Sequence, residues 1–371
     1  MIKTEIMKKL KFLVASLLFC AISYVGYMGY ESVTMSDVGE VGEIIVYDSQ
    51  KAYSFKDIMD VVDFVPLKLN GLMLDDFSEV VVKDSSIFVV DKTLKKTIYH
   101  FNKTGKYINT IGTVGRAYNE YLELSDFTVS DNSVLVFDSQ NRQALHYALD
   151  GTLQKKDMLQ KEFEKAYLLD DDYILYLGDC NGNRKWKLFM EKSDNEYLKS
   201  NDDVIHFSEL FSVFCNCNDS IYVRETLSNS IYLLYNERLV KLYTFDFGFN
   251  NIPEEFCKQS SVDNSMEILS KSEYTYQRQF CFSEDYCLVE NVINKWNGAL
   301  SVYAILDKSN HDWVWVKELD RESSFYQTFK FIDDEGFFYF LLDDVKLEKS
   351  NVTDFMNFGY GLLKCRLKVK V

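Results

Sequence analysis

Two stretches of the chain repeat one pattern of apolar strands and polar turns. In each, an apolar run that ends at an aspartate leads through a polar turn into a second strand, and a glycine-containing hairpin turn then opens a third strand. The aspartates, Asp91 and Asp138, are 47 residues apart, and the hairpin glycines, Gly105 and Gly151, are 46 apart. The first copy comprises 87–91 and 98–106, and the second comprises 134–138 and 145–152.

Weaker copies of this pattern continue to the end of the chain. A period of 40 to 50 residues with several strands in each unit is typical of β-propellers. The sequence therefore predicts an all-β, six-bladed β-propeller with mostly four-stranded antiparallel blades. Residues 255–271 break the period and are interpreted as an insertion in the fourth unit. The six units are expected at roughly 80–125, 126–165, 166–209, 210–277, 278–327 and 328–371.

The segment before the first unit is expected to close the ring. Residues 60–69 have the pattern of a single strand, which would complete the last blade and cover its unpaired edge. A strand pattern also resumes at 43–47. The chain has only two prolines and no flexible linker, so 43–371 is predicted to form one domain.

The N-terminal 30 residues have the features of an export segment. Three lysines, Lys8, Lys9 and Lys11, precede an uncharged apolar run over 12–30. The segment fits a signal peptide cleaved after Ser23, and its length is also close to the about 20 residues that span a bilayer as an uncleaved anchor. A lipidated Cys20 is the third alternative, against which the bulky Phe19 counts. Residues 31–42 read as a tether.

Each of these fates predicts an exported protein in the periplasm or at the cell surface, with membrane contact only through the N-terminal segment. Net charge of −16, with acidic residues scattered along the chain, argues against nucleic acid as a partner. We expect a monomer.

Seven further cysteines follow the export segment, an odd number for an oxidising compartment. Cys215 and Cys217 are separated by one residue, which is a weak zinc motif. We expect most of the seven to be buried strand residues, with Cys257, Cys281 and Cys287 the favoured partners in any disulfide. The set is Cys180, Cys215, Cys217, Cys257, Cys281, Cys287 and Cys365.

Candidate catalytic and metal-binding groups are few. His100 and His146 occupy equivalent repeat positions, which favours a structural role, and the other two histidines are His206 and His311. Acidic clusters at 170–172, 202–203, 333–335 and 343–344 flank strands, where aspartate suits turns. No metal ligands and no cofactor are predicted, although calcium could use such carboxylates. No nucleophile elbow or phosphate-binding loop is present, so whether the protein is an enzyme stays open.

One loop carries a resemblance to a known group of proteins. At 111–121 the chain resembles the signature Gly-Arg-Gly-Pro-Gly-Glu-Tyr of the NHL-like six-bladed β-propeller proteins of Bacteroidales envelopes, most of which have no known function. Gly115, Arg116, Glu120 and Tyr121 match that signature, whereas 117–119 depart from it. The resemblance implies the same fold and compartment, and it makes Arg116, Glu120 and Tyr121 candidate ligand-binding residues; the alternative is that they pack a connection between blades.

The function that we expect is a binding module for a glycan or an envelope protein. Tryptophans at 186, 296, 313 and 315 could stack on sugars, although 313–315 reads first as a buried strand face. One alternative is a metal-dependent hydrolase or lyase with calcium or zinc at the central channel. Another is a structural component of the envelope.

Overall fold

The computed structural model describes most of the chain after residue 41. Within the described residues no helix is both long and apolar enough to cross a membrane. The N-terminal segment, Cys20 and the interrupted stretch at 255–271 lie outside them. The described ranges are 42–68, 79–93, 95–178, 186–199, 211–218, 220–225, 227–253, 272–295, 298–317, 329–343 and 359–368.

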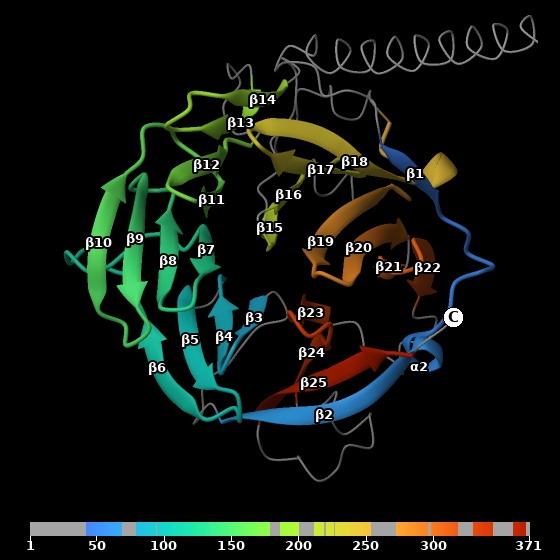
Figure 1. Cartoon of the computed structure of the whole chain (residues 1–371), viewed down its shortest axis with the longest axis horizontal. Helices are drawn as coiled ribbons and strands as arrows, with labels where there is room; N and C mark the ends of the chain where they lie inside the picture. Colours follow the sequence, from blue (N-terminus) through green and yellow to red (C-terminus); the bar gives the residue numbers. More distant parts are fainter. Residues whose placement is uncertain are drawn as a thin grey trace, which may run out of the picture.

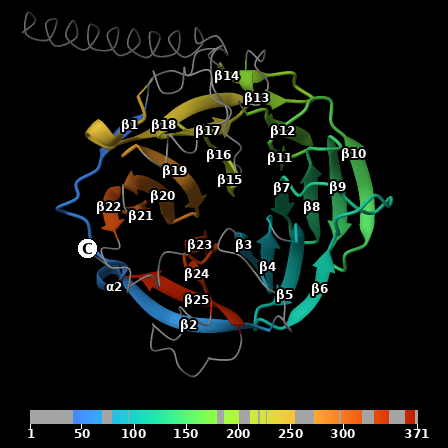
Figure 2. The ribbon, with the colours of Figure 1, turned by 180° about the vertical axis from the view of Figure 1, so that it is seen from behind.

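Six small antiparallel sheets stand in a ring around one axis, as Figure 1 shows and Figure 2 repeats from behind. Five sheets have four strands, and the fourth blade has a fifth strand added in parallel. This confirms the predicted six-bladed propeller. From the axis outward, the first three blades are β3 (Glu79–Lys83), β4 (Ser86–Asp91), β5 (Thr97–Asn102) and β6 (Tyr107–Ile111); β7 (Asp126–Val129), β8 (Ser133–Asp138), β9 (Gln143–Ala148) and β10 (Leu153–Met158); and β11 (Lys165–Leu169), β12 (Asp172–Tyr176), β13 (Trp186–Met190) and β14 (Glu196–Lys199).

The remaining blades follow the same order, and two of them end in a strand from the beginning of the chain. Two short helices complete the described elements, α2 (Phe55–Ile58) and the 3₁₀ helix η1 (Gly248–Asn250). The blades are β15 (Phe214–Cys217), β16 (Ser220–Arg224), β17 (Ser230–Tyr235), β18 (Arg238–Asp246) and β1 (Glu43–Val46); β19 (Thr275–Phe282), β20 (Tyr286–Lys295), β21 (Gly298–Asp307) and β22 (Asp312–Lys317); and β23 (Phe329–Ile332), β24 (Phe338–Asp343), β25 (Gly359–Leu367) and β2 (Met59–Lys68).

The second strands of the first two blades are buried along almost their whole length because both faces of a blade pack against neighbouring blades. Five of the six residues of β4 are buried, and β8 has the same pattern. Strands buried on both faces form continuous apolar runs rather than alternating ones. These two strands are the ones that the sequence repeat revealed.

The glycines of the repeat occupy the hairpin turns that the sequence predicts. Gly105 and Gly151 have φ angles of +74° and +87°. At Gly105 a side chain would also collide with the backbone, because a Cβ there would lie 2.0 Å from the carbonyl oxygen of Pro66. The first blade thus meets β2 so closely that only glycine fits.

The ring is closed by β2, as the sequence predicts for residues 60–69. This strand pairs with β25 in antiparallel register from Met59 with Leu367 to Lys68 with Gly359. Its last amide, Lys68 N–H, donates to the carbonyl of Gly105 in the first blade at 3.0 Å. The sixth blade is therefore completed by the start of the chain and joined to the first.

The segment from 43 to 68 follows the rim of three blades, as the blue trace in Figure 1 shows. After β1 pairs with β18, Tyr53 exchanges backbone hydrogen bonds with Trp315 and Lys317 at the edge of β22. Helix α2 then leads into β2 on the sixth blade. We call residues 43–68 the rim segment.

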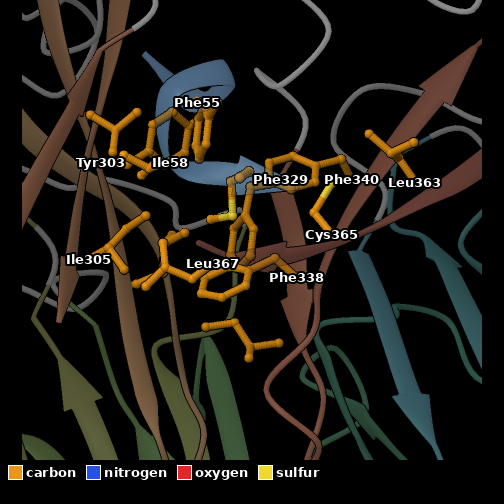
Figure 3. Packing of buried hydrophobic residues seen from close by; sticks show 14 of the residues in the cluster. Phe55, Ile58, Tyr303, Ile305, Phe329, Phe338, Phe340, Leu363, Cys365 and Leu367 are labelled. Atoms are coloured by element: carbon orange, nitrogen blue, oxygen red, sulfur yellow. The ribbon is translucent and has the colours of Figure 1, made fainter. Parts of the chain in front are cut away.

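Helix α2 anchors the rim segment in the core between the fifth and sixth blades. Ser54 caps its first turn, and Phe55 and Ile58 are fully or almost fully buried. Figure 3 shows both side chains beside the aromatic residues of the two blades. The ring of Phe55 lies 4.9 Å from that of Tyr303 and 5.3 Å from that of Phe340.

The sequence pattern did not reveal the innermost strand of each blade. The repeat began at the apolar strand ending in aspartate, which is the second strand of its blade, so the innermost strands β3 and β7 were not recognised as elements of the repeat. Those inner strands are only five and four residues long, and half or more of their residues are only partly buried.

Truncation of Leu67 to alanine should destabilise the closed ring. This β2 side chain is fully buried in the cluster between the sixth and first blades, so Leu67→Ala is expected to lower the free energy of unfolding by about 2–5 kcal/mol. Val61→Ala on the same strand is the matched control, because Val61 is 53% exposed and its truncation should cost less than about 0.5 kcal/mol. Urea unfolding followed by tryptophan fluorescence measures both; equal losses would show that burial of Leu67 does not stabilise the closure.

Candidate functional site

A cavity of about 460 Å³ lies on the axis of the propeller, within the range of small-molecule sites. Its wall takes residues from β3, β7, β11, β15, β19 and β23, the innermost strands of all six blades. In the sheets as described, each of these strands has a sheet neighbour on its outer side only. We call this cavity the central channel.

The wall of the central channel is polar as well as apolar. Lysine and carboxylate groups lie beside amides, which together offer both hydrogen-bond donors and acceptors. The aromatic side chains of Tyr167 and Phe331 add apolar surface. The polar wall residues are Glu79, Lys83, Thr128, Ser212, Asn216, Asn218, Gln279, Lys330 and Asp334.

Buried charges from several blades meet where the innermost strands begin. The ammonium of Lys92, which is 8% exposed, lies 2.6 Å from Glu79 Oε1 and 3.6 Å from Asp126 Oδ1. The hydroxyl of Ser212 donates to the other oxygen of Asp126 at 3.0 Å, and its amide donates to Glu79 at 3.3 Å. Lys165 adds a second buried ammonium, which donates to the carbonyl of Ser125 at 2.8 Å. The first four blades are thereby joined at this end of the central channel.

The protonation of this cluster depends on burial and on its opposite charges. Burial disfavours the ammonium of Lys92, but the attraction of Glu79 and Asp126 outweighs it and holds the pKa above its usual value. For Asp126 burial is the larger effect, and its pKa is raised despite the nearby Lys92 and Lys165. A charge buried in such a network becomes costly once its partner is removed.

Arg224 connects the same region to the fifth blade. Its guanidinium is fully buried and donates to the carbonyl oxygens of Phe211, Ser212 and Gln277 at 3.3 to 3.5 Å. The beginnings of β15 and β19 are therefore held together by a side chain from β16. These contacts join the fourth and fifth blades at this end of the channel.

Two cysteine thiols complete the wall between the fourth, fifth and sixth blades. The sulfur of Cys215 accepts the amide N–H of Phe282 at 3.1 Å, and the sulfur of Cys281 accepts that of Ile332 at 3.4 Å. Both amides belong to the innermost strand of the following blade. The five described cysteines are free thiols, so the disulfide expected among Cys257, Cys281 and Cys287 does not join Cys281 to Cys287, and Cys180 and Cys257 lie outside the described residues.

The loop that resembles the Bacteroidales signature is held in place by its own residues. Tyr121 is fully buried between the first and second blades, and its hydroxyl donates to the carbonyl of Lys96 at 2.7 Å. A carboxylate oxygen of Glu120 accepts the amide of Ala117 at 2.7 Å. The carboxylate also lies close to Gly115, where an added Cβ would be 1.9 Å from it unless the Glu120 side chain moved.

These contacts show how the loop is built and leave one of its matched side chains open to solvent. Arg116 is exposed and makes no hydrogen bond or ion pair with the residues that the structure describes. The loop contributes no residue to the wall of the central channel. Ligand contact by Arg116, Glu120 and Tyr121 stays a prediction, and the buried Tyr121 supports the loop rather than presenting a surface.

The histidines of the repeat lie within blades. His100 on β5 and His146 on β9 have equivalent positions, opposite Phe88 and Leu135. The ring of His100 stacks on Phe88 and hydrogen-bonds to Ser86 and Asn109, while His146 contacts Asp157 at 3.0 Å. Across the described ranges, no group of three or more His, Cys, Asp or Glu side chains is arranged to hold a metal ion.

The acidic clusters at 170–172 and 333–335 organise turns. Asp333 accepts the amides of Glu335 and Phe337 at 3.1 and 2.8 Å, and Asp172 accepts that of Lys192 at 2.7 Å. Residues 202–203, and Asp344 of the cluster at 343–344, lie outside the described ranges. Trp315 is buried against the rim segment, where its indole N–H donates to the carbonyl of Val46 at 3.0 Å, which agrees with the expected buried strand face.

The fold and the channel define a six-bladed β-propeller with a polar axial cavity. A family model described as a domain of unknown function (DUF4934) matches residues 41–354, and the chain belongs to this family. No curated protein matches the sequence.

Two solved structures share this fold at low identity. One is a protein from Bacteroides fragilis named as a candidate for export, with 16% identity, 88% of this chain and 100% of that chain covered, and a TM-score of 0.72. The other is a member of the DUF4221 family from Bacteroides vulgatus, with 11% identity, coverage of 84% and 99%, and a TM-score of 0.55. At such identities the likeness concerns the fold.

Removal of the Lys92 ammonium should destabilise the protein, because the buried carboxylates beside it lose their positive partner. Lys92→Met removes the positive charge that pairs with the carboxylates of Glu79 and Asp126. We therefore expect the free energy of unfolding to fall by about 3–5 kcal/mol. Lys83→Met, which breaks the more exposed pair with Asp131 at 3.2 Å, should cost less than about 1 kcal/mol. Urea unfolding at pH 7 compares the two variants; similar losses would contradict a special role of the buried cluster.

Proposed function

We propose that this protein is an exported binding module that holds a small glycan in its central channel. Export is supported by the basic and then apolar N-terminal segment. Binding is supported by one observation above all, the cavity on the propeller axis with polar groups from several blades in its wall. Neither an activity nor a ligand follows from the fold alone.

The chemistry of the wall suits a ligand with many hydroxyl groups. Asn216 provides an amide, and Gln279 provides an amide oxygen that can accept, since its Nε2 donates to the carbonyl of Phe329 at 2.6 Å. Lysine ammonium groups add donors, and the carboxylate of Asp334 adds acceptors. Tyr167 and Phe331 offer aromatic surface of the kind that sugar rings can contact. A glycan therefore fits this mixture better than an apolar ligand does.

A binding screen with channel variants tests this proposal. The full chain, purified from the envelope, is titrated with mono- and disaccharides while its melting temperature is followed, because a ligand of the native state raises it. Asn216→Leu keeps a similar volume but removes the amide from the channel, and we expect it to weaken the binding of an active glycan about fivefold to tenfold.

Arg116→Ala is the matched control, since Arg116 lies outside the channel wall. It should leave the affinity unchanged. Loss of binding in this variant with normal binding in Asn216→Leu would instead place the ligand at the loop of 111–121.

Two further results would replace the proposal. Stoichiometric metal in the purified protein, with a lower melting temperature in EDTA, would favour the hydrolase or lyase alternative with a cation at the channel. Stable co-purification of another envelope protein without any glycan response would favour a partner-binding or structural role.

A further inference from the structure

Three large apolar side chains are exposed at the outer edge of the fourth blade. Ile44 and Val46 are 65% and 63% exposed, and Phe249 is fully exposed. They belong to β1 and to η1, the short gold helix beside β1 on the circumference of the ring in Figures 1 and 2. We call Ile44, Val46 and Phe249 the rim patch.

The pairing of β1 turns Ile44 and Val46 outward. The strand joins β18 in parallel register, with Val46 opposite Asp246. Ile45, between the two exposed residues, is buried in the apolar cluster of the fourth and fifth blades. Because successive side chains of a strand point to opposite faces, the burial of Ile45 places its two neighbours together on the other face.

Phe249 is held near β1 by the turn that follows β18. The carbonyl of Asp246 accepts the amide of Tyr47 at 2.9 Å, directly after β1. The carboxylate of Asp246 accepts the amide of Gly248 at 2.8 Å and the side-chain amide of Asn251 at 2.6 Å. The turn is therefore fixed on both sides of Phe249, and this fixed turn presents the phenylalanine ring to solvent.

The chain that leads to the rim patch indicates what covers it. Residues 31–42 join β1 to the uncharged apolar run at 12–30. Twelve residues reach at most about 40 Å when fully extended. If the apolar run stays in a membrane as an uncleaved anchor, β1 is therefore the part of the propeller that is tied closest to the bilayer. A lipidated Cys20 would tie the same strand to the membrane through a longer connection.

The chemistry of the rim patch fits the surface of a bilayer. Exposed aromatic and aliphatic side chains insert at the boundary between headgroups and acyl chains. The net charge of −16 gives no attraction to anionic headgroups, so the contact has to be apolar. In the sheets as described, the outer edge of β1 has no strand neighbour. Its backbone groups need water, which limits the depth of insertion to the boundary region.

We propose that the rim patch lies in the surface of the bilayer that holds the N-terminal segment. This adds a second membrane contact to that of the N-terminal segment itself. Because the patch is on the circumference of the ring, the propeller stands edge-on at the membrane, with its axis along the membrane plane. Both ends of the central channel then remain open to the surrounding solution.

Quenching of an added tryptophan by brominated lipid tests this contact. The full chain carrying Phe249→Trp is purified from the envelope and reconstituted into phosphatidylcholine vesicles with either plain or brominated acyl chains. The wild type, measured in the same way, gives the signal of the native tryptophans. After its subtraction, we expect the emission of the added indole to be about twofold lower in the brominated vesicles, because the side chain enters the headgroup boundary.

Tyr118→Trp is the matched control, because Tyr118 is also a highly exposed aromatic residue, at 77%. Its ring lies 4.9 Å from Lys156 Nζ on β10, which is on the opposite side of the ring from β1 in Figure 1. The indole added there should not be quenched. Val46→Asp, introduced into the Phe249→Trp chain, places a charge in the rim patch without touching the core and should remove most of the quenching.

Equal quenching at positions 249 and 118, or no quenching at either, would overturn the proposal. So would a mature chain that begins after Ser23 and stays in solution instead of joining the vesicles. The central channel takes no part in this measurement, so failure of the membrane contact leaves the proposed glycan binding untouched.

Discussion

The free inner edges of the six blades are the constraint on which the central channel depends. In each described sheet the innermost strand has a partner on one side only, and the six strands together surround the axis. Backbone amides along such an edge need hydrogen-bond acceptors or water. Cys215 and Cys281 each provide an acceptor for an edge amide of the next blade. The wall of the channel is therefore polar where the blades meet.

The buried ion cluster links the blades that form this wall. Glu79, Lys92 and Asp126 come from two blades, and Ser212 joins them from the start of the fourth. Buried charges are tolerated only while their partners stay in place. Movement of one blade relative to the next would separate these groups. The same cluster thus links the first, second and fourth blades at one end of the channel.

The sequence predicted the blades well and their inner edges poorly, for one physical reason. Middle strands such as β4 and β8 are buried on both faces, so they form apolar runs that repeat visibly. An inner strand such as β15 is short and combines Phe214 and two cysteines with the exposed Asn216, which resembles a loop or a weak metal motif. The loop at 111–121 was found by resemblance, but the contacts of Cys215 and Cys281 with amides of the next blade depend on blade packing that no local pattern contains.

The rim segment also determines how the ring responds to mechanical load at the N-terminal side. A pull on residue 42 first reaches the four residue pairs that join β1 to β18. The next attachments are the backbone bonds of Tyr53 and the buried helix α2, and only then the long pairing of β2 with β25. Force is therefore met by successive attachments on three blades, and the first of them can detach without breaking the pairing that closes the ring.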